Sequence, residues 1–287
     1  MVGELAMSVS RYVAPESVEE ILTEMKEQEG NYAFMAGGTI VQPLLSSGSW
    51  LPHTVIGLWR APLAAVEREN GTIAIGAGAN MRDLASHTLP GGLSDAARQV
   101  GAPAIRNRAT LGGNIAIGRG DLIVPLLALD AWVTLMSPSG TRDTPISEVL
   151  DQATGELRDV AEGHLLTRVL VPATESSSAY VAIGRKSYNT PCVASVSVNA
   201  SFESSTTVLT GLKVAVHGPQ AWPVRAEAVE QVLVGRGLDD GAIREAEEAM
   251  SSVGDGYSDS VASAWYRASM SRVVLRRALA QLAKGRP

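Results

Sequence analysis

The sequence of 287 residues predicts an α+β protein, and three stretches carry that prediction. The first is a strand, a helix and a second strand ahead of Gly37. The second is a set of short β-rich segments between about residues 54 and 171. The third is a stretch of period-2 alternation after residue 192, followed by helices. A strand–helix–strand unit at the start and a sheet followed by helices at the end are typical of this class.

The first stretch opens with a helix signal. Ser17-x-x-Glu20 has the form of a capping box, and apolar residues recur at helical spacing behind it: Val18, Ile21, Leu22 and Met25. This helix is expected to end near Gly30. The apolar run Tyr32 to Ala36 then predicts a strand that stops at the pair Gly37-Gly38.

The middle of the chain mixes strands and helices. Strands are expected at 54–58, 72–76, 132–136 and 164–171. Helices are expected near 83–87, 94–100 and 121–128, the last with Pro125 in its first turn, where a helix tolerates proline. Pro103 and the pair Gly112-Gly113 predict a loop between them.

A linker or wide loop is expected at 172–178, which reads PATESSS. Beyond it, Val196, Val198, Ala200 and Phe202 alternate with the polar Ser195, Ser197, Asn199 and Ser201. This alternation, repeated around Val214, predicts an antiparallel sheet with one covered face. Helices through 243–250 and from about residue 260 complete the chain.

The composition excludes several kinds of protein. The charge of −6 argues against nucleic-acid binding, and 45% hydrophobic residues indicate a globular chain. Cys192 is the single cysteine, so the chain can form no internal disulfide and cannot by itself hold an iron–sulfur cluster. The four histidines lack metal-type spacing. Without a signal peptide or a membrane-length apolar run, the chain is expected to be soluble and cytoplasmic, with no membrane span.

Two glycine pairs are the candidate chemical features: Ala36-Gly37-Gly38-Thr39 and Thr110-Leu111-Gly112-Gly113. Glycine lets backbone N–H groups approach a phosphate closely, and the two threonine hydroxyls could donate as well. Two such turns brought together could hold a dinucleotide, although each alone is more simply a tight turn. No G-x-G-x-x-G fingerprint, P-loop or G-x-S-x-G elbow is present.

Five segments together resemble one protein family. They are AGGT at 36–39, IGAGANMRDLA at 75–85, GAPAIRNRATLGGNIA at 101–116, DLIVPLLALDA at 121–131 and VLVGRGLDDGAIREA at 232–246. In order and spacing they resemble the FAD-binding medium subunit of bacterial molybdenum hydroxylases, the family of carbon monoxide dehydrogenase and xanthine dehydrogenase. The resemblance extends over nearly the whole chain.

The resemblance implies a fold and a set of partners. The fold would be a two-part FAD-binding domain, with a small βαβ subdomain at 1–57 and a larger mixed one at 58–175, followed by a C-terminal domain of antiparallel strands and a helical bundle at 176–287. This chain would hold FAD. A small subunit would carry two [2Fe–2S] clusters and a large subunit the molybdopterin cofactor, in a dimer of heterotrimers that passes electrons to an external acceptor.

The resemblance also implies site residues. Met35 to Val41 would surround the FAD pyrophosphate, with Thr110, Gly112, Gly113, Asn114 and Ile115 as the second phosphate turn. Asp121 would bind a ribose hydroxyl, Leu170 or Val171 would lie near the flavin or adenine, and Lys186 would lie near the isoalloxazine edge. The complete set is Met35, Ala36, Gly37, Gly38, Thr39, Ile40, Val41, Thr110, Gly112, Gly113, Asn114, Ile115, Asp121, Leu170, Val171 and Lys186. No catalytic or metal-binding residue is predicted in this chain.

One departure from the family bears on function. The carbon monoxide enzyme has Gly-Asp-Tyr after its basic pair, whereas Arg185-Lys186 is followed here by Ser187, and the tyrosine comes at 188. This shift makes carbon monoxide a less suitable substrate of the complex. Carbon monoxide, purines, N-heteroaromatics and aldehydes stay open, with an N-heteroaromatic or purine-like compound preferred. Two alternatives stay open: a stand-alone FAD-dependent oxidoreductase of the same superfamily, and a non-catalytic binding protein with degenerate glycine turns.

Overall fold

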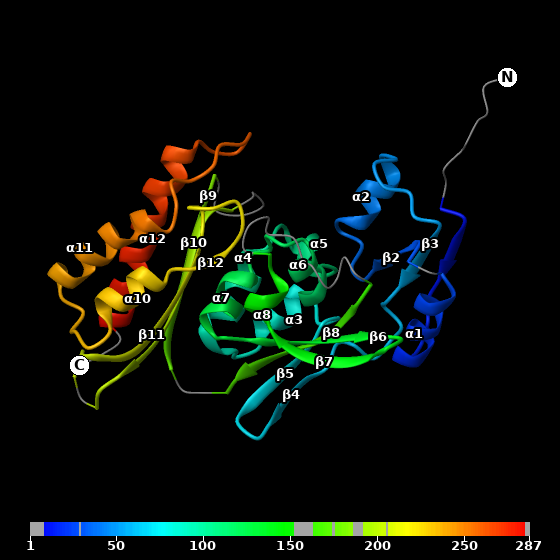
Figure 1. Cartoon of the computed structure of the whole chain (residues 1–287), viewed down its shortest axis with the longest axis horizontal. Helices are drawn as coiled ribbons and strands as arrows, with labels where there is room; N and C mark the ends of the chain where they lie inside the picture. The colour runs from blue at the N-terminus through cyan, green and yellow to red at the C-terminus, as the bar shows by residue number, and fades with distance from the viewer. Residues whose placement is uncertain are drawn as a thin grey trace.

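The computed structural model describes residues 9–28, 30–151, 163–173, 176–185, 192–204 and 206–284. Three sheets follow one another along the long axis of the molecule (Figure 1). The helices pack on these sheets, and each sheet has a hydrophobic core of its own. This mixed architecture confirms the predicted α+β class. The predicted boundaries at 57/58 and 175/176 stay a prediction.

The N-terminal unit is a small parallel sheet of order β1-β3-β2, with two helices. Ser17 caps the first helix as the sequence predicts, because its side chain accepts a hydrogen bond from the Glu20 N–H at 3.1 Å. The elements are β1 (Arg11–Val13), α1 (Val18–Glu27), β2 (Tyr32–Met35), α2 (Val41–Ser46) and β3 (Thr54–Gly57).

The central unit is a five-stranded antiparallel sheet of order β4-β5-β8-β6-β7, covered by short helices. Its strands are β4 (Val66–Glu69), β5 (Thr72–Gly76), β6 (Trp132–Ser137), β7 (Gly140–Pro145) and β8 (Leu165–Pro172). Its helices are α3 (Met81–Ser86), α4 (Leu93–Gln99), α5 (Pro103–Arg106), α6 (Leu111–Ala116), α7 (Ile123–Ala128) and α8 (Ile146–Val149), with a 3₁₀ turn at Pro90–Gly92. The expected strands and helices are present within a few residues of their predicted bounds.

One expectation for this unit is wrong. Gly112 and Gly113 were expected in a loop, but both lie inside α6, and residues 103–106 form a turn of helix. The helix begins at the glycine pair because Thr110 caps it, accepting a hydrogen bond from the Gly113 N–H at 3.2 Å.

The C-terminal unit is an antiparallel sheet of order β12-β11-β10-β9 under three helices. The elements are β9 (Ser177–Gly184), β10 (Cys192–Phe202), β11 (Leu209–His217), β12 (Val224–Arg225), α10 (Glu227–Leu233), α11 (Asp240–Ala249) and α12 (Ala264–Lys284), with a 3₁₀ turn at Met250–Ser252. No helix in these described ranges is both long and apolar enough to cross a membrane.

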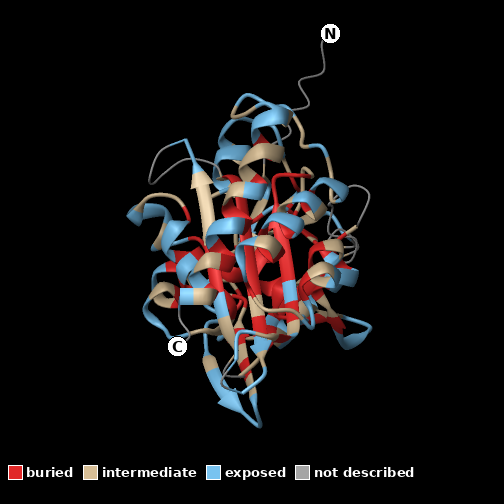
Figure 2. Ribbon diagram, turned by 90° about the vertical axis from the view of Figure 1, so that its left-hand side faces the viewer, coloured by how far each residue is buried: buried red, intermediate tan, exposed pale blue. Residues whose placement is uncertain are grey.

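The expectation of one covered face is also wrong. Val196 and Val198 pack against the helices of the C-terminal unit, but Ser195 and Ser197 on the opposite face are 0% exposed. That face lies against the central unit, where the Ser197 hydroxyl donates to the Gly91 carbonyl at 2.8 Å. Figure 2 shows the resulting continuous buried interior between exposed outer helices. The polar stripe of β10 therefore faces a second unit of the same chain rather than water.

Candidate cofactor-binding site

The two predicted glycine turns lie against each other. A Cβ added to Gly37 would be 1.9 Å from the carbonyl oxygen of Arg108, so only glycine permits this contact. The Arg108 Nε also donates to the Gly37 carbonyl at 3.0 Å. The turn after β2 and the turn before α6, which are far apart in the sequence, thus form one surface.

The first turn presents unpaired backbone donors. Gly38 has a φ of +72°, a left-handed conformation that glycine adopts readily. Within the described chain, the N–H groups of Gly37, Gly38 and Thr39 donate to no acceptor. Unpaired N–H groups at a glycine turn are suited to binding an anion.

The rest of the predicted Met35–Val41 segment frames this turn. Met35 ends β2, and its carbonyl accepts from Leu58 at 2.9 Å, which anchors the start of the turn in the sheet. Ala36 is half-buried, Ile40 is 50% exposed, and Val41 begins α2. The exposed Ile40 gives the turn an apolar neighbour on its outer side.

In the second turn, unlike the first, the backbone N–H groups of Gly112 and Gly113 are used in hydrogen bonds within the protein. The Gly112 N–H donates to the Ala77 carbonyl at 2.8 Å, and a Cβ on Gly112 would be 2.9 Å from the Ala77 Cβ. Because Thr110 Oγ1 accepts from the Gly113 N–H, the hydroxyl proton of Thr110 stays available to donate. The second turn therefore offers a ligand a hydroxyl donor, whereas the first turn offers free N–H groups.

A third loop, residues 76–80, supports the second turn, although no role in the site was predicted for it from the sequence. Residues 76–80 read GAGAN; within them Ala79 accepts from Leu111, and Met81 just beyond donates to Ala109, both at 2.9 Å. Asn80 caps α3 by accepting from the Asp83 N–H at 2.9 Å. The available signal was the pair Gly76 and Gly78, both of which lie against the backbone of Leu63.

Asn114 positions the loop that carries Asp121. Its side-chain oxygen accepts from the Leu122 N–H at 3.0 Å, and a Cβ on Gly120 would be 2.0 Å from the Asn114 carbonyl. Asp121 is half-buried, and burial raises the pKa of its carboxyl to about 6. The structure therefore links two of the predicted residues, with Asn114 holding the loop of Asp121.

Asp121 lies where the central and C-terminal units meet. Burial, followed by the charge of Asp121, raises the pKa of Cys192 to about 12 and that of Tyr180 well above its ordinary value. The hydroxyls of Tyr180 and Ser195 are buried and lie close to each other, and their interaction opposes part of the rise in the pKa of Tyr180.

The remaining predicted residues are placed less directly. Ile115 and Val171 are 0% exposed in the central core, so their side chains pack against protein. Leu170 is half-buried in β8, paired with Ala74 and Trp132. Lys186 and Tyr188 lie outside the described residues.

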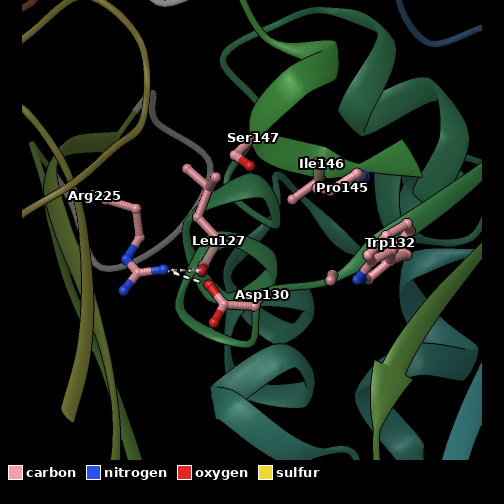
Figure 3. A pocket seen from close by; sticks show the side chains of 8 residues that line it. Leu127, Asp130, Trp132, Pro145, Ile146, Ser147 and Arg225 are labelled. Carbon is pink, nitrogen blue, oxygen red and sulfur yellow. Dashed lines mark hydrogen bonds and ion pairs between the residues drawn. The ribbon is translucent and has the colours of Figure 1, made fainter.

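A hollow also lies at the junction of the central and C-terminal units, and none of the predicted site residues lines it. It has a volume of about 220 Å³ and is lined by Leu127, Asp130, Trp132, Ile146 and Arg225, among others (Figure 3). Arg225 donates to Asp130 and to the Leu127 carbonyl, and binds both oxygens of Glu230. Since its guanidinium is already paired, this hollow is a structural joint between the units.

Family models match most of the chain. Residues 6–174 match the FAD binding domain in molybdopterin dehydrogenase, and residues 178–282 match the CO dehydrogenase flavoprotein C-terminal domain. Among curated proteins, the alpha subunit of the 6-hydroxypseudooxynicotine dehydrogenase complex of Paenarthrobacter nicotinovorans is 31% identical, over 96% of this chain and 95% of the relative. The glyceraldehyde dehydrogenase medium chain of Sulfolobus acidocaldarius is 28% identical, over 95% and 98%.

Solved structures agree with these matches. A carbon monoxide dehydrogenase from Hydrogenophaga pseudoflava, in a form lacking the Mo-pyranopterin moiety of its cofactor, superimposes with a TM-score of 0.87 at 26% identity. The match covers 96% of this chain and 97% of that chain.

Proposed function

This chain belongs to the family of FAD-binding medium subunits of molybdenum hydroxylases, and from that premise we propose that it carries electrons from an iron–sulfur subunit to an external acceptor. The flavin of FAD can take up two electrons and release them one at a time. The observation that carries the proposal is the pairing of the two glycine turns through Gly37 and Arg108.

The residues at the two turns fit the FAD pyrophosphate. The free N–H groups of Gly37, Gly38 and Thr39 would hold the phosphate oxygens, and the Thr110 hydroxyl would donate from the second turn. Asp121, on the loop fixed by Asn114, would accept a hydrogen bond from a ribose hydroxyl. The buried hydroxyl of Tyr180, whose pKa the charge of Asp121 raises, and the neighbouring hydroxyl of Ser195 would offer further polar contacts.

In the proposed function the electrons enter from another chain. A [2Fe–2S] cluster takes four protein ligands, mostly cysteine, whereas Cys192 is the single cysteine of this sequence. In the described ranges no three potential ligands gather as a metal site. We therefore place two [2Fe–2S] clusters on a small partner and the molybdopterin cofactor on a large one, in a dimer of heterotrimers. A free thiol suits a reducing compartment such as the cytoplasm.

The substrate of the complex would be chosen by the molybdenum subunit rather than by this chain. Relatives named nicotine 6-hydroxylase medium subunit and caffeine dehydrogenase subunit beta are 28% and 24% identical to it. Both names refer to N-heterocyclic compounds, which supports an N-heteroaromatic or purine-like substrate here.

The first test is FAD binding by the purified full-length chain. Titration followed by absorbance is expected to give about one FAD per chain. Gly37→Ala should abolish binding, because the new Cβ would overlap the Arg108 carbonyl and push the two turns apart. Gly211→Ala is the matched control, since the nearest atom to a Cβ there is 3.8 Å away, and it should bind FAD like the wild type.

The second test separates this function from a stand-alone oxidoreductase. In the complex with its two partners, the substrate should reduce the flavin, and the purified chain alone should show no such reduction. Reduction of the flavin by substrate in the isolated chain would instead establish the stand-alone enzyme. A wild-type chain that binds no FAD, alone or in the complex, would contradict both.

A further inference from the structure

Arg108 holds an unusual place among the arginines of the central unit. Its Nε donates to the Gly37 carbonyl at 3.0 Å, and its Nη2 lies 3.9 Å from the position a Cβ on Gly38 would occupy. Because of these two contacts the side chain lies at the junction of the two turns, and it is exposed there. It joins the segment after β2 to the segment before α6.

The guanidinium of Arg108 is not used in an ion pair. Within the described residues no carboxylate lies within 4.0 Å of it, whereas Arg82 pairs with Asp83 at 3.1 Å and Arg98 with Asp95 at 2.5 Å. Its neighbour Arg106 is taken up by the carbonyls of Val100 and Gly101, at 3.2 and 2.6 Å. Arg106 thus uses its Nη1 within the loop, whereas neither Nη group of Arg108 donates to an acceptor in the described chain.

A full positive charge at the glycine turns would have to come from a side chain, because their backbone supplies none. The donors of both turns are neutral N–H and hydroxyl groups, yet a pyrophosphate carries about two negative charges. Guanidinium groups match phosphate oxygens in geometry, and hydrogen bonds with a charged partner are about twice as strong as neutral ones.

We propose that Arg108 binds the pyrophosphate of FAD, with its Nε held on the Gly37 carbonyl and its Nη groups supplying the charge. This inference rests on the proposed FAD-binding function and assigns a residue to it. The competing role is purely mechanical: Arg108 would tie the two turns together through Nε and contribute no charge to the ligand.

The two roles differ in their response to salt. An exposed charge acting on a phosphate is screened as ionic strength rises, because the Debye length falls from about 10 Å at 0.1 M to about 3 Å at 1 M. The strength of the intramolecular hydrogen bond between Nε and the Gly37 carbonyl changes little with ionic strength. The salt dependence of FAD affinity is therefore the distinguishing quantity.

The experiment measures the FAD dissociation constant of the full-length chain between 0.05 and 0.5 M NaCl. Three variants are compared with the wild type: Arg108→Gln, Arg108→Lys and the control Arg277→Gln. Arg277 is exposed on α12 and has no ion pair in the described chain; α12 lies at the other end of the molecule from α2 (Figure 1). Both Gln variants change the net charge equally.

Arg108→Gln should weaken FAD binding about tenfold or more at low salt and flatten the salt dependence. Arg108→Lys keeps the charge, so it should retain most of the FAD affinity and most of its salt dependence. Arg277→Gln should match the wild type in both quantities. The proposal would be overturned in favour of the mechanical role if the Gln and Lys variants lost FAD affinity equally and both kept the salt dependence of the wild type. Unchanged affinity in Arg108→Gln would also overturn it. A wild-type chain without FAD would instead refute the proposed function.

Discussion

At the scale of single residues, Asp121 shows how a group proposed to bind FAD can oppose stability. Its folded pKa of about 6 lies above the ordinary value of 3.8, because burial disfavours the charged carboxylate. The folded chain therefore binds the proton more tightly than the unfolded chain. The sign follows: ionised Asp121 destabilises the fold above pH 6, and this cost shrinks as the pH falls from 6 towards 3.8.

Asp121→Asn should accordingly make the FAD-free chain more stable at pH 8, and the gain should fade between pH 6 and 4. The same variant should bind FAD more weakly, because an amide replaces the carboxylate that we propose binds the ribose. Thermal melts of variant and wild type are compared at each pH, which cancels the opposite contribution of His217, whose pKa burial lowers to about 4. The control Asp95→Asn, at an exposed ion pair, should change stability little. Lower stability of Asp121→Asn at pH 8 would contradict this account.

At the scale of elements, α12 is fastened to the start of β10 by one buried arginine. Arg267 is 1% exposed; it donates to the Val193 carbonyl at 2.8 Å and to both oxygens of Asp259 at 2.8 Å. The ring of Tyr257 lies 4.1 Å from its guanidinium carbon. These contacts of Arg267 thus fix the start of β10 against α12.

Arg267→Met should destabilise the chain by about 3 kcal/mol, because it leaves Asp259 and the Val193 carbonyl without their charged donor. Denaturation in urea measures the loss. Arg236→Met is the control in the same unit: its pair with Glu245 is exposed, so the expected change is below about 1 kcal/mol. Equal effects of the two substitutions would show that burial of Arg267 adds nothing.

The same scale shows what the sequence could and could not predict. Alternation found the strand β10, and the capping pattern at Ser17 found α1, because both are local signals. Period 2 cannot tell a face in water from a face packed on another unit, so the burial of Ser195 and Ser197 was missed. The glycine pairs stood out in the sequence itself and the family resemblance implied their ligand, but the proposed roles of Arg108 and of the GAGAN loop depend on contacts that are remote in the sequence.

At the scale of the whole molecule, the central and C-terminal units share an interior. Tyr180 packs where Gly92 lacks a Cβ, Ala215 of β11 lies in the central core, and Ser197 bonds to Gly91. Asp130, between the units, pairs with both Lys213 and Arg225. Since apolar surface is buried across the junction, the two units are expected to unfold together.

Ser197→Asp tests this coupling. A carboxylate at this fully buried position would lie at the junction without a partner, which should cost several kcal/mol and separate the units. Calorimetry should give one transition for the wild type, with calorimetric and van't Hoff enthalpies equal, and two for the variant. Ser201→Asp introduces the same charge at an exposed position of the same strand and should keep the single transition. Two transitions in the wild type would mean that the two units are stable independently and would contradict this coupling.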